Sequence, residues 1–175
     1  MSAKYTKNYI QSRNPIIISR GYTLIEILVG LTILGLLFGF GFASFRDFSR
    51  RQVVSGVGKL IEGDLRLVQQ QALSGQKPDD VKCDPPNNLS GYRFTVNSSS
   101  QYIASANCSG GVVVVKTVNL PEGVTISTPS PNPIEFKVLG HGTNIASGLM
   151  STVTITQAGT NNTLNVAVSS SGEIK

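Results

Sequence analysis

The first part of the chain contains a long stretch without charge. From Ile27 to Phe45, 19 residues carry no charged side chain, and a single carboxylate, Glu26, stands directly before them. The 24 residues from Tyr22 to Phe45 would form about 36 Å of helix at about 1.5 Å per residue, which is long enough to cross a bilayer.

After Arg46 the pattern becomes that of a helix with one buried face. Apolar residues recur at steps of three and four, at Val53, Val57, Ile61, Leu65, Val68 and Ala72. Gly75 and Pro78 then supply a stop. We therefore expect one helix from about Thr23 to Ser74, apolar all round in its first half and amphipathic in its second half.

From Gly91 onward apolar residues alternate with polar ones, which is the period of β-strands. The alternating sets are Tyr92/Phe94/Val96, Ile134/Phe136/Val138, Val153/Ile155 and Leu164/Val166/Val168. Further apolar runs at 101–106, 112–118 and 123–127 are separated by Gly, Pro, Asn and Ser. These patterns predict about seven short strands and an α+β fold, with the long helix packed on an antiparallel β-sheet head.

The patterns divide the chain into a basic N-terminal segment at 1–21, an apolar half of the helix at 22–45, an amphipathic half at 46–76 and a β-rich head at 77–175. The resemblance described below implies that the first segment is a cleaved leader and the second a transmembrane or filament-core half. Four basic residues and no acids precede Gly21, so the leader is +4 and the remainder is 11 − 10 = +1. Basic residues before a membrane helix hold that end in the cytoplasm, so the head is expected on the outer side.

Glu26 is an isolated carboxylate at the start of the apolar helix. An unpaired charge in hydrocarbon costs several kcal/mol, so an acid at this place indicates a function and needs a cationic partner. A cut between Gly21 and Tyr22 would create an α-amino group at that depth. The alternative is a secretory signal cleaved before Ser44, but the apolar run exceeds the usual length of about 7–15 residues.

The junction Gly21-Tyr22-Thr23-Leu24-Ile25-Glu26, followed by the apolar run, resembles the N-terminus of type IV prepilins. The resemblance implies that a prepilin peptidase cuts between Gly21 and Tyr22, that Tyr22 is N-methylated, and that Glu26 acts in assembly. The family most often has Phe where Tyr22 stands. The implied partners are prepilin peptidase, other pilins or pseudopilins in a hetero-oligomeric filament, and an inner-membrane assembly platform. The implied location is the cytoplasmic membrane, with one span and an extracytoplasmic head.

Segments of the head are similar to H-type minor pseudopilins and FimT-type minor pilins. They are Asp64-Leu65-Arg66-Leu67-Val68-Gln69-Gln70-Gln71-Ala72, Leu120-Pro121-Glu122-Gly123-Val124, Ile134-Glu135-Phe136 with Gly140, and a final strand ending Gly172-Glu173-Ile174. This likeness implies a minor subunit of a type IV pilus or a type II secretion pseudopilus that helps to initiate or cap filament assembly. The alternative is a different class of protein, a membrane-anchored or secreted binding domain that acts alone and is not part of a filament.

A DNA-uptake minor pilin is a further alternative, because some FimT-type members bind DNA through a basic C-terminal Gly-Arg-x-Arg motif. This chain has Gly172-Glu173-Ile174-Lys175 there. From Leu67 to Lys175, six basic and six acidic residues give a net charge of zero. Nucleic-acid binding usually needs a clustered basic patch, so the sequence argues against it.

The two cysteines, Cys83 and Cys108, both lie in the outward-facing part, where a disulfide is permitted. The sequence leaves a bridge and two reduced thiols open, and we expect the bridge.

We expect neither an enzyme nor a cofactor, and no catalytic or metal-binding residues. His141 is the only histidine and lies between two glycines, so a general base with a matching acid and nucleophile cannot be assembled. Asp79, Asp80 and Asp84 offer oxygen ligands for Ca²⁺, but they lack the spacing of a calcium loop, and we interpret them as part of a solvated turn.

Overall fold

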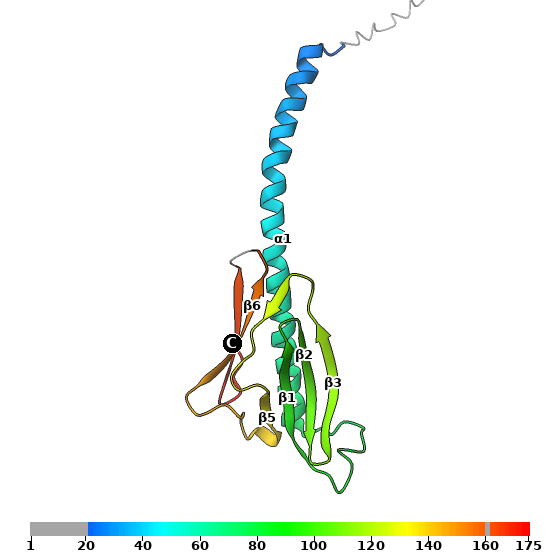
Figure 1. Ribbon diagram of the computed structural model, residues 1–175, viewed down its shortest axis with the longest axis vertical. Helices are drawn as coiled ribbons and strands as arrows, with labels where there is room; N and C mark the ends of the chain where they lie inside the picture. Colours follow the sequence, from blue (N-terminus) through cyan, green and yellow to red (C-terminus); the bar gives the residue numbers. More distant parts are fainter. Residues whose placement is uncertain (1–20, 160–161) are drawn as a thin grey trace, which may run out of the picture. The chain divides into compact units, whose positions relative to one another are not determined.

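A computed structural model describes residues 21–159 and 162–175, without the side chains of residues 40–44 and 47. The predicted leader therefore lies outside the described residues, apart from Gly21. The chain divides into two compact units, Met1–Ala43 and Ser44–Lys175. One helix, α1, spans Leu24–Ser74 (Figure 1), which confirms the predicted bounds to within one residue.

Short-range hydrogen bonds set both ends of α1. The Thr23 hydroxyl accepts a hydrogen bond from the backbone N–H of Glu26 at 3.3 Å, which makes Thr23 the N-cap. At the other end, the N–H of Gly75 donates to the carbonyl of Ala72 at 3.2 Å. Gly75 has a φ of 63°, a left-handed conformation that glycine adopts without strain and that terminates helices.

The apolar side chains of the first unit are exposed all around the helix. Between Leu24 and Phe38 the large apolar side chains are exposed by 48–83%. Monomeric proteins rarely expose an apolar surface of this kind, so this part of α1 requires a partner or an apolar medium. Among the described residues, no helix is both long and apolar enough to cross a membrane.

In the second unit, seven described strands form two antiparallel sheets beside the later part of α1 (Figure 1). The first sheet has the order β3-β2-β1-β5 and consists of β1 (Leu89–Ser98), β2 (Gln101–Cys108), β3 (Gly111–Asn119) and β5 (Ile134–Lys137). The second has the order β4-β6-β7 and consists of β4 (Val124–Ile126), β6 (Met150–Gln157) and β7 (Thr163–Ser169). A 3₁₀-helix, η1 (Val138–Gly140), follows β5. The α+β prediction is confirmed, with the strands divided between two sheets.

The core of the second unit is built from the buried stripe of α1 and one face of each sheet. Its largest fully buried side chains include Ile61, Leu65, Val68, Tyr92, Phe94, Tyr102, Ile134, Val153, Ile155 and Val168. The predicted stripe on α1 is confirmed except at Val53, which is 37% exposed, whereas Val54 is buried at 4%. Both positions fit a helical step before Val57, and the sheet lies on the side of Val54, next to Leu164 of β7.

The predicted final strand through Ile174 is wrong. The last strand, β7, ends at Ser169. The chain then turns at Gly172, which has a φ of 93°, and folds back along β7. Lys175 exchanges two backbone hydrogen bonds with Ala167, both at 2.9 Å. The C-terminal residues therefore extend the edge of the second sheet instead of lengthening β7.

Candidate functional site

The predicted processing residues lie at the start of α1. Gly21 and Tyr22 precede the helix and are exposed, and Glu26 lies exposed in its first turn. Exposed, non-helical backbone is the form in which chains are most readily cut by proteases. The bond between Gly21 and Tyr22 is therefore accessible next to the carboxylate that is predicted to act in assembly.

The first turn of α1 is capped by Thr23, and Glu26 lies near its positive end. Thr23 and Glu26 have the Thr-x-x-Glu spacing of a capping box, and the Thr23 hydroxyl bonds the N–H of Glu26. The N-terminus of a helix also carries about half a positive charge. An amine on Tyr22 would add a full positive charge within one turn. Sequence analysis missed the cap at Thr23, although this spacing was available to reveal it.

A buried carboxylate joins α1 to the first sheet. Asp64 accepts a hydrogen bond from the Tyr102 hydroxyl at 2.7 Å, and its two oxygens lie 2.6 and 2.9 Å from the Lys116 amine. The Asp64 side chain is 8% exposed, whereas that of Lys116 is 40% exposed. Sequence analysis did not identify this cluster. One feature of the sequence could have revealed the cluster: Asp64 is an acid on the face of the helix that Ile61 and Leu65 bury.

Two buried tyrosines predict a loss of stability in alkali. Burial, the hydrogen bond to Asp64 and the charge of that carboxylate raise the pKa of Tyr102 far above its ordinary value of about 10. Burial also raises the pKa of Tyr92, whose hydroxyl donates to the carbonyl of Gln76 at 2.6 Å. The folded state thus holds these protons more tightly than the unfolded state. Their stabilising contribution is complete below about pH 10 and is lost as the pH rises further.

We expect the free energy of unfolding to fall above about pH 10 and to fall less steeply in Tyr102→Phe. Urea denaturation of both proteins from neutral to alkaline pH measures this difference. The comparison is needed because lysines titrate in the same range. Equal slopes for the two proteins would show that Tyr102 does not contribute.

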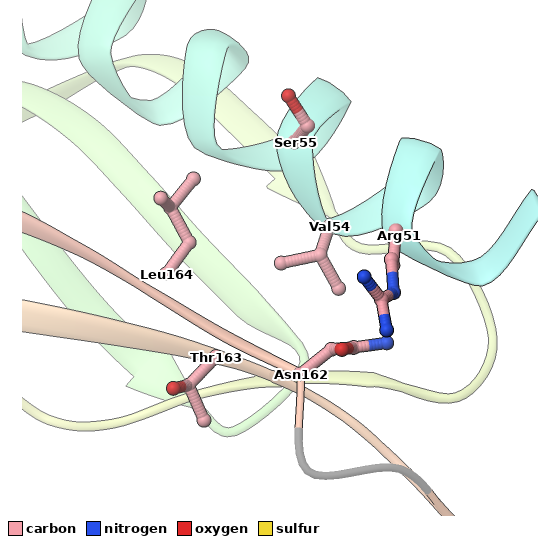
Figure 2. Close-up of a pocket in the computed structure, with 6 residues that line it drawn as sticks. All are labelled: Arg51, Val54, Ser55, Asn162, Thr163 and Leu164. Atoms are coloured by element: carbon pink, nitrogen blue, oxygen red, sulfur yellow. The ribbon is translucent and has the colours of Figure 1, made fainter. Parts of the chain in front are cut away.

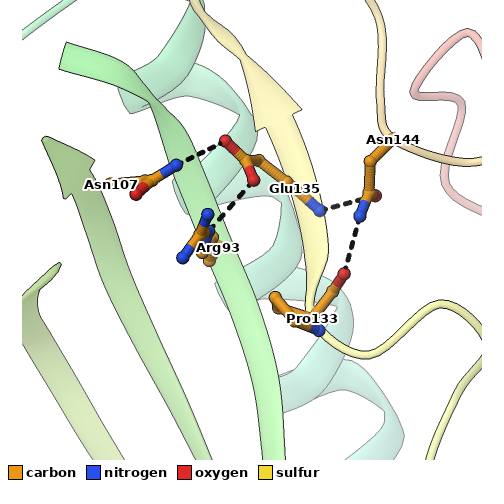
Figure 3. Close-up of polar contacts among 5 residues, drawn as sticks. All are labelled: Arg93, Asn107, Pro133, Glu135 and Asn144. Atoms are coloured by element: carbon orange, nitrogen blue, oxygen red, sulfur yellow. Dashed lines mark hydrogen bonds and ion pairs between the residues drawn. The ribbon is translucent and has the colours of Figure 1, made fainter. Parts of the chain in front are cut away.

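A polar network holds β5 against β1 and β2 on the face opposite the core (Figure 3). The two oxygens of Glu135 accept hydrogen bonds from Arg93 at 3.0 Å and Asn107 at 2.9 Å. Asn144 accepts the N–H of Glu135 and donates to the carbonyl of Pro133, both at 2.9 Å. Because both of its oxygens are engaged, Glu135 acts as a structural carboxylate.

Cys83 and Cys108 form a disulfide, with their Cα atoms 5.2 Å apart, so the expected bridge is confirmed. It ties the segment after α1 to the end of β2. The same segment is held by Lys82, whose amine donates to the carbonyl of Val112 in β3 at 3.2 Å. The bridge therefore fixes this segment over the beginning of β3.

Replacing both cysteines by Ser is expected to destabilise the head. The bridge joins residues 25 positions apart, and closing a loop of this size contributes about 3 kcal/mol in the chain-entropy model. For a domain of this size, that corresponds to a melting temperature about 10 °C lower. Calorimetry with and without reductant measures the effect: reductant should lower the melting temperature of the native protein and leave the double variant unchanged. Equal melting temperatures for the two oxidised samples would contradict the expectation.

The acidic loop forms a local turn. Asp80 accepts the N–H of Lys82 at 2.9 Å, and the N–H of Cys83 donates to the carbonyl of Asp80 at 2.8 Å. Asp79 and Asp84 are exposed. Within residues 21–159 and 162–175, no group of three or more His, Cys, Asp or Glu side chains is placed to hold a metal ion. His141 is exposed in the loop after η1.

Similarity to known proteins is found at the N-terminus and in an alignment over about half of the chain. Residues 18–42 match the family model of the prokaryotic N-terminal methylation motif. A fimbrial protein of Neisseria meningitidis serogroup A is 27% identical over 97 residues, covering 55% of this chain and 54% of the relative. The match thus spans about half the length of that relative, and no solved structure matches. Together with the α+β architecture, these findings support a type IV prepilin-like protein.

Proposed function

We propose that the chain is a minor pilin or pseudopilin, a structural subunit of a type IV pilus-like filament or of the pseudopilus of type II secretion. One observation carries this proposal: the methylation motif at 18–42 includes the first part of α1, whose apolar side chains are exposed on all sides. Such a surface needs hydrocarbon or other apolar helices around it. A filament subunit meets both in turn, the bilayer before assembly and neighbouring subunits afterwards.

In this proposal, prepilin peptidase cuts between Gly21 and Tyr22, and the new amine of Tyr22 is methylated. Residues 22–45 then anchor the chain in the cytoplasmic membrane, with the head outside. An assembly platform in that membrane adds the subunit to a filament of other pilins or pseudopilins. The +4 charge of the residues before Gly21 supports this orientation, because basic residues before a membrane helix hold that end in the cytoplasm.

The likeness of the head to H-type and FimT-type proteins supports a minor subunit that helps to initiate or cap assembly. Two of the similar segments contain the carboxylates that hold the head together. Asp64 anchors α1 to the first sheet, and Glu135 anchors β5 to its neighbours. The carboxylates in these two segments therefore stabilise the head itself, whichever partner the head contacts.

DNA uptake is disfavoured by the C-terminal residues. Glu173 forms an ion pair with Lys175 at 3.2 Å, and the backbone of Lys175 is bonded to Ala167. The cation at the C-terminus is thus matched by a neighbouring acid. A site that binds phosphates needs unmatched basic side chains.

The mature protein is expected to begin at Tyr22 with a methylated amine. Mass spectrometry of the N-terminal peptide, from protein isolated from membranes or sheared filaments, decides this directly. Gly21→Ala is the matched variant, because the family's peptidase cuts after Gly, and the variant should retain the leader. A mature start at Ser44 would replace the prepilin interpretation with that of a secreted protein.

A further inference from the structure

A groove opens on one side of the head, between α1 and the beginning of β7 (Figure 2). It measures about 280 Å³ and is lined by Arg51, Val54, Ser55, Asn162, Thr163 and Leu164. Val54 and Leu164 supply its apolar floor, and Leu164 is 39% exposed although the alternation of β7 predicts it inside. Gly58 leaves room for the Leu164 side chain against α1, because a Cβ at residue 58 would collide with it.

The segment of α1 that contributes Arg51 to the groove is basic. Residues 46–51 contain three arginines and one acid, for a net charge of 3 − 1 = +2. No charged residue occurs from 138 to 172, which includes all of β6 and β7. Arg51 lines the groove, and among the described residues it forms no ion pair with a carboxylate. The groove thus combines an apolar floor with an unmatched guanidinium, which suits an anionic amphiphile.

The place of Arg51 on the helix matches the level of lipid headgroups. Arg51 follows Phe45, the end of the uncharged stretch, by six residues, or about 9 Å of helix. The headgroup layer extends about 5–8 Å beyond the hydrocarbon core. The Cα–Cβ bonds of a helix tilt toward its N-terminus, which brings the side chain of Arg51 closer to this level. In Figure 2 its guanidinium lies beside Asn162. Phe48 is exposed three residues before Arg51, on the same side of the helix.

We propose that this groove binds the phosphate of an anionic phospholipid in the outer leaflet of the cytoplasmic membrane. Arg51 bonds the phosphate oxygens, for which its planar fork is suited. Val54 and Leu164 contact the apolar part of the lipid just below the headgroup. The proposal rests on the proposed function, because it needs residues 22–45 in the membrane.

Native mass spectrometry of the full-length chain tests this proposal. The protein is released from nanodiscs of equal parts phosphatidylglycerol and phosphatidylcholine, and the retained lipids of each kind are counted. We expect about a tenfold preference for phosphatidylglycerol, because the choline ammonium of phosphatidylcholine offsets the phosphate charge that Arg51 meets. Arg51→Gln should abolish the preference, and Arg51→Lys should retain part of it. Lys59→Gln is the matched control, because it removes the same charge from α1 at an exposed position outside the groove.

Equal retention of the two lipids by the unaltered chain would overturn the proposal, as would equal losses in Arg51→Gln and Lys59→Gln. If Arg51→Gln keeps the preference yet drops out of filaments, the occupant is an acidic residue of a neighbouring subunit, and the proposal is again wrong. Failure of the chain to float with vesicles is a separate result. It would overturn the membrane anchor of the proposed function together with this inference.

Discussion

Glu26→Ala is expected to be synthesised, inserted and cleaved at Gly21, yet to be strongly depleted from filaments. In the membrane, the amine of Tyr22 can remain hydrated near the surface when the carboxylate is absent. Within a filament, the exposed apolar side chains of the first unit become enclosed by other helices, and water is removed from both charges. Removing one partner of a buried pair leaves the other uncompensated, at about 3–5 kcal/mol. Immunoblots of sheared filaments against membranes measure the depletion.

Two matched variants separate the charge of Glu26 from its place in the capping box. Glu26→Gln keeps a side chain that can complete the box but loses the charge. Thr23→Ala removes the hydroxyl that bonds the N–H of Glu26 and keeps the charge, at about 1 kcal/mol. We expect Glu26→Gln to behave like Glu26→Ala, and Thr23→Ala to assemble nearly normally. Full incorporation of Glu26→Gln would assign the residue to helix capping alone.

Much of this fold could be predicted because its local signals agree with one another. The bounds of α1 follow from a capping residue, an uninterrupted helical pattern and Gly75, and the strands follow from alternation between turn residues. Periodicity could not decide between Val53 and Val54, because steps of three and four are both helical. Only the position of the sheet makes that choice. The division into two sheets depends on long-range pairing, such as that of β4 with β6, which periodicity does not encode.

The functional and structural residues of the site also fall into two groups, those that the sequence could predict and those that it could not. Gly21, Tyr22 and Glu26 could be predicted because they are adjacent in sequence and their chemistry depends on that spacing. Asp64, Tyr102 and Lys116 are separated by 38 and 52 positions along the chain and meet only in the folded head. The groove at Arg51 likewise combines a helix with a strand that lies more than a hundred residues later. Sites of this second kind require the tertiary arrangement.

Asp64→Ala is expected to lower the free energy of unfolding by about 4 kcal/mol. Without the carboxylate, the hydroxyl of the fully buried Tyr102 loses its acceptor, and a buried unpaired hydroxyl costs about 1–3 kcal/mol. The lost charge-assisted bond and the cavity left at the site add to this penalty. The loss of a partner for Lys116 adds less than about 1 kcal/mol to this penalty, because the Lys116 side chain is 40% exposed and water can hydrate its amine instead. Urea denaturation of the full-length protein measures the change.

The double variant Asp64→Ala with Tyr102→Phe distinguishes a stranded hydroxyl from general damage to the core. Replacing both partners removes the unpaired group, so the double variant should be more stable than Asp64→Ala alone by about 1–2 kcal/mol. Lys116→Met is not a neutral control, because it leaves the Asp64 carboxylate, 8% exposed, without its cation and should itself be destabilising. A double variant as unstable as the sum of its two single changes would show that Asp64 and Tyr102 do not interact. In that case the attachment of α1 to the first sheet would rest on apolar packing at Ile61, Leu65 and Val68 alone.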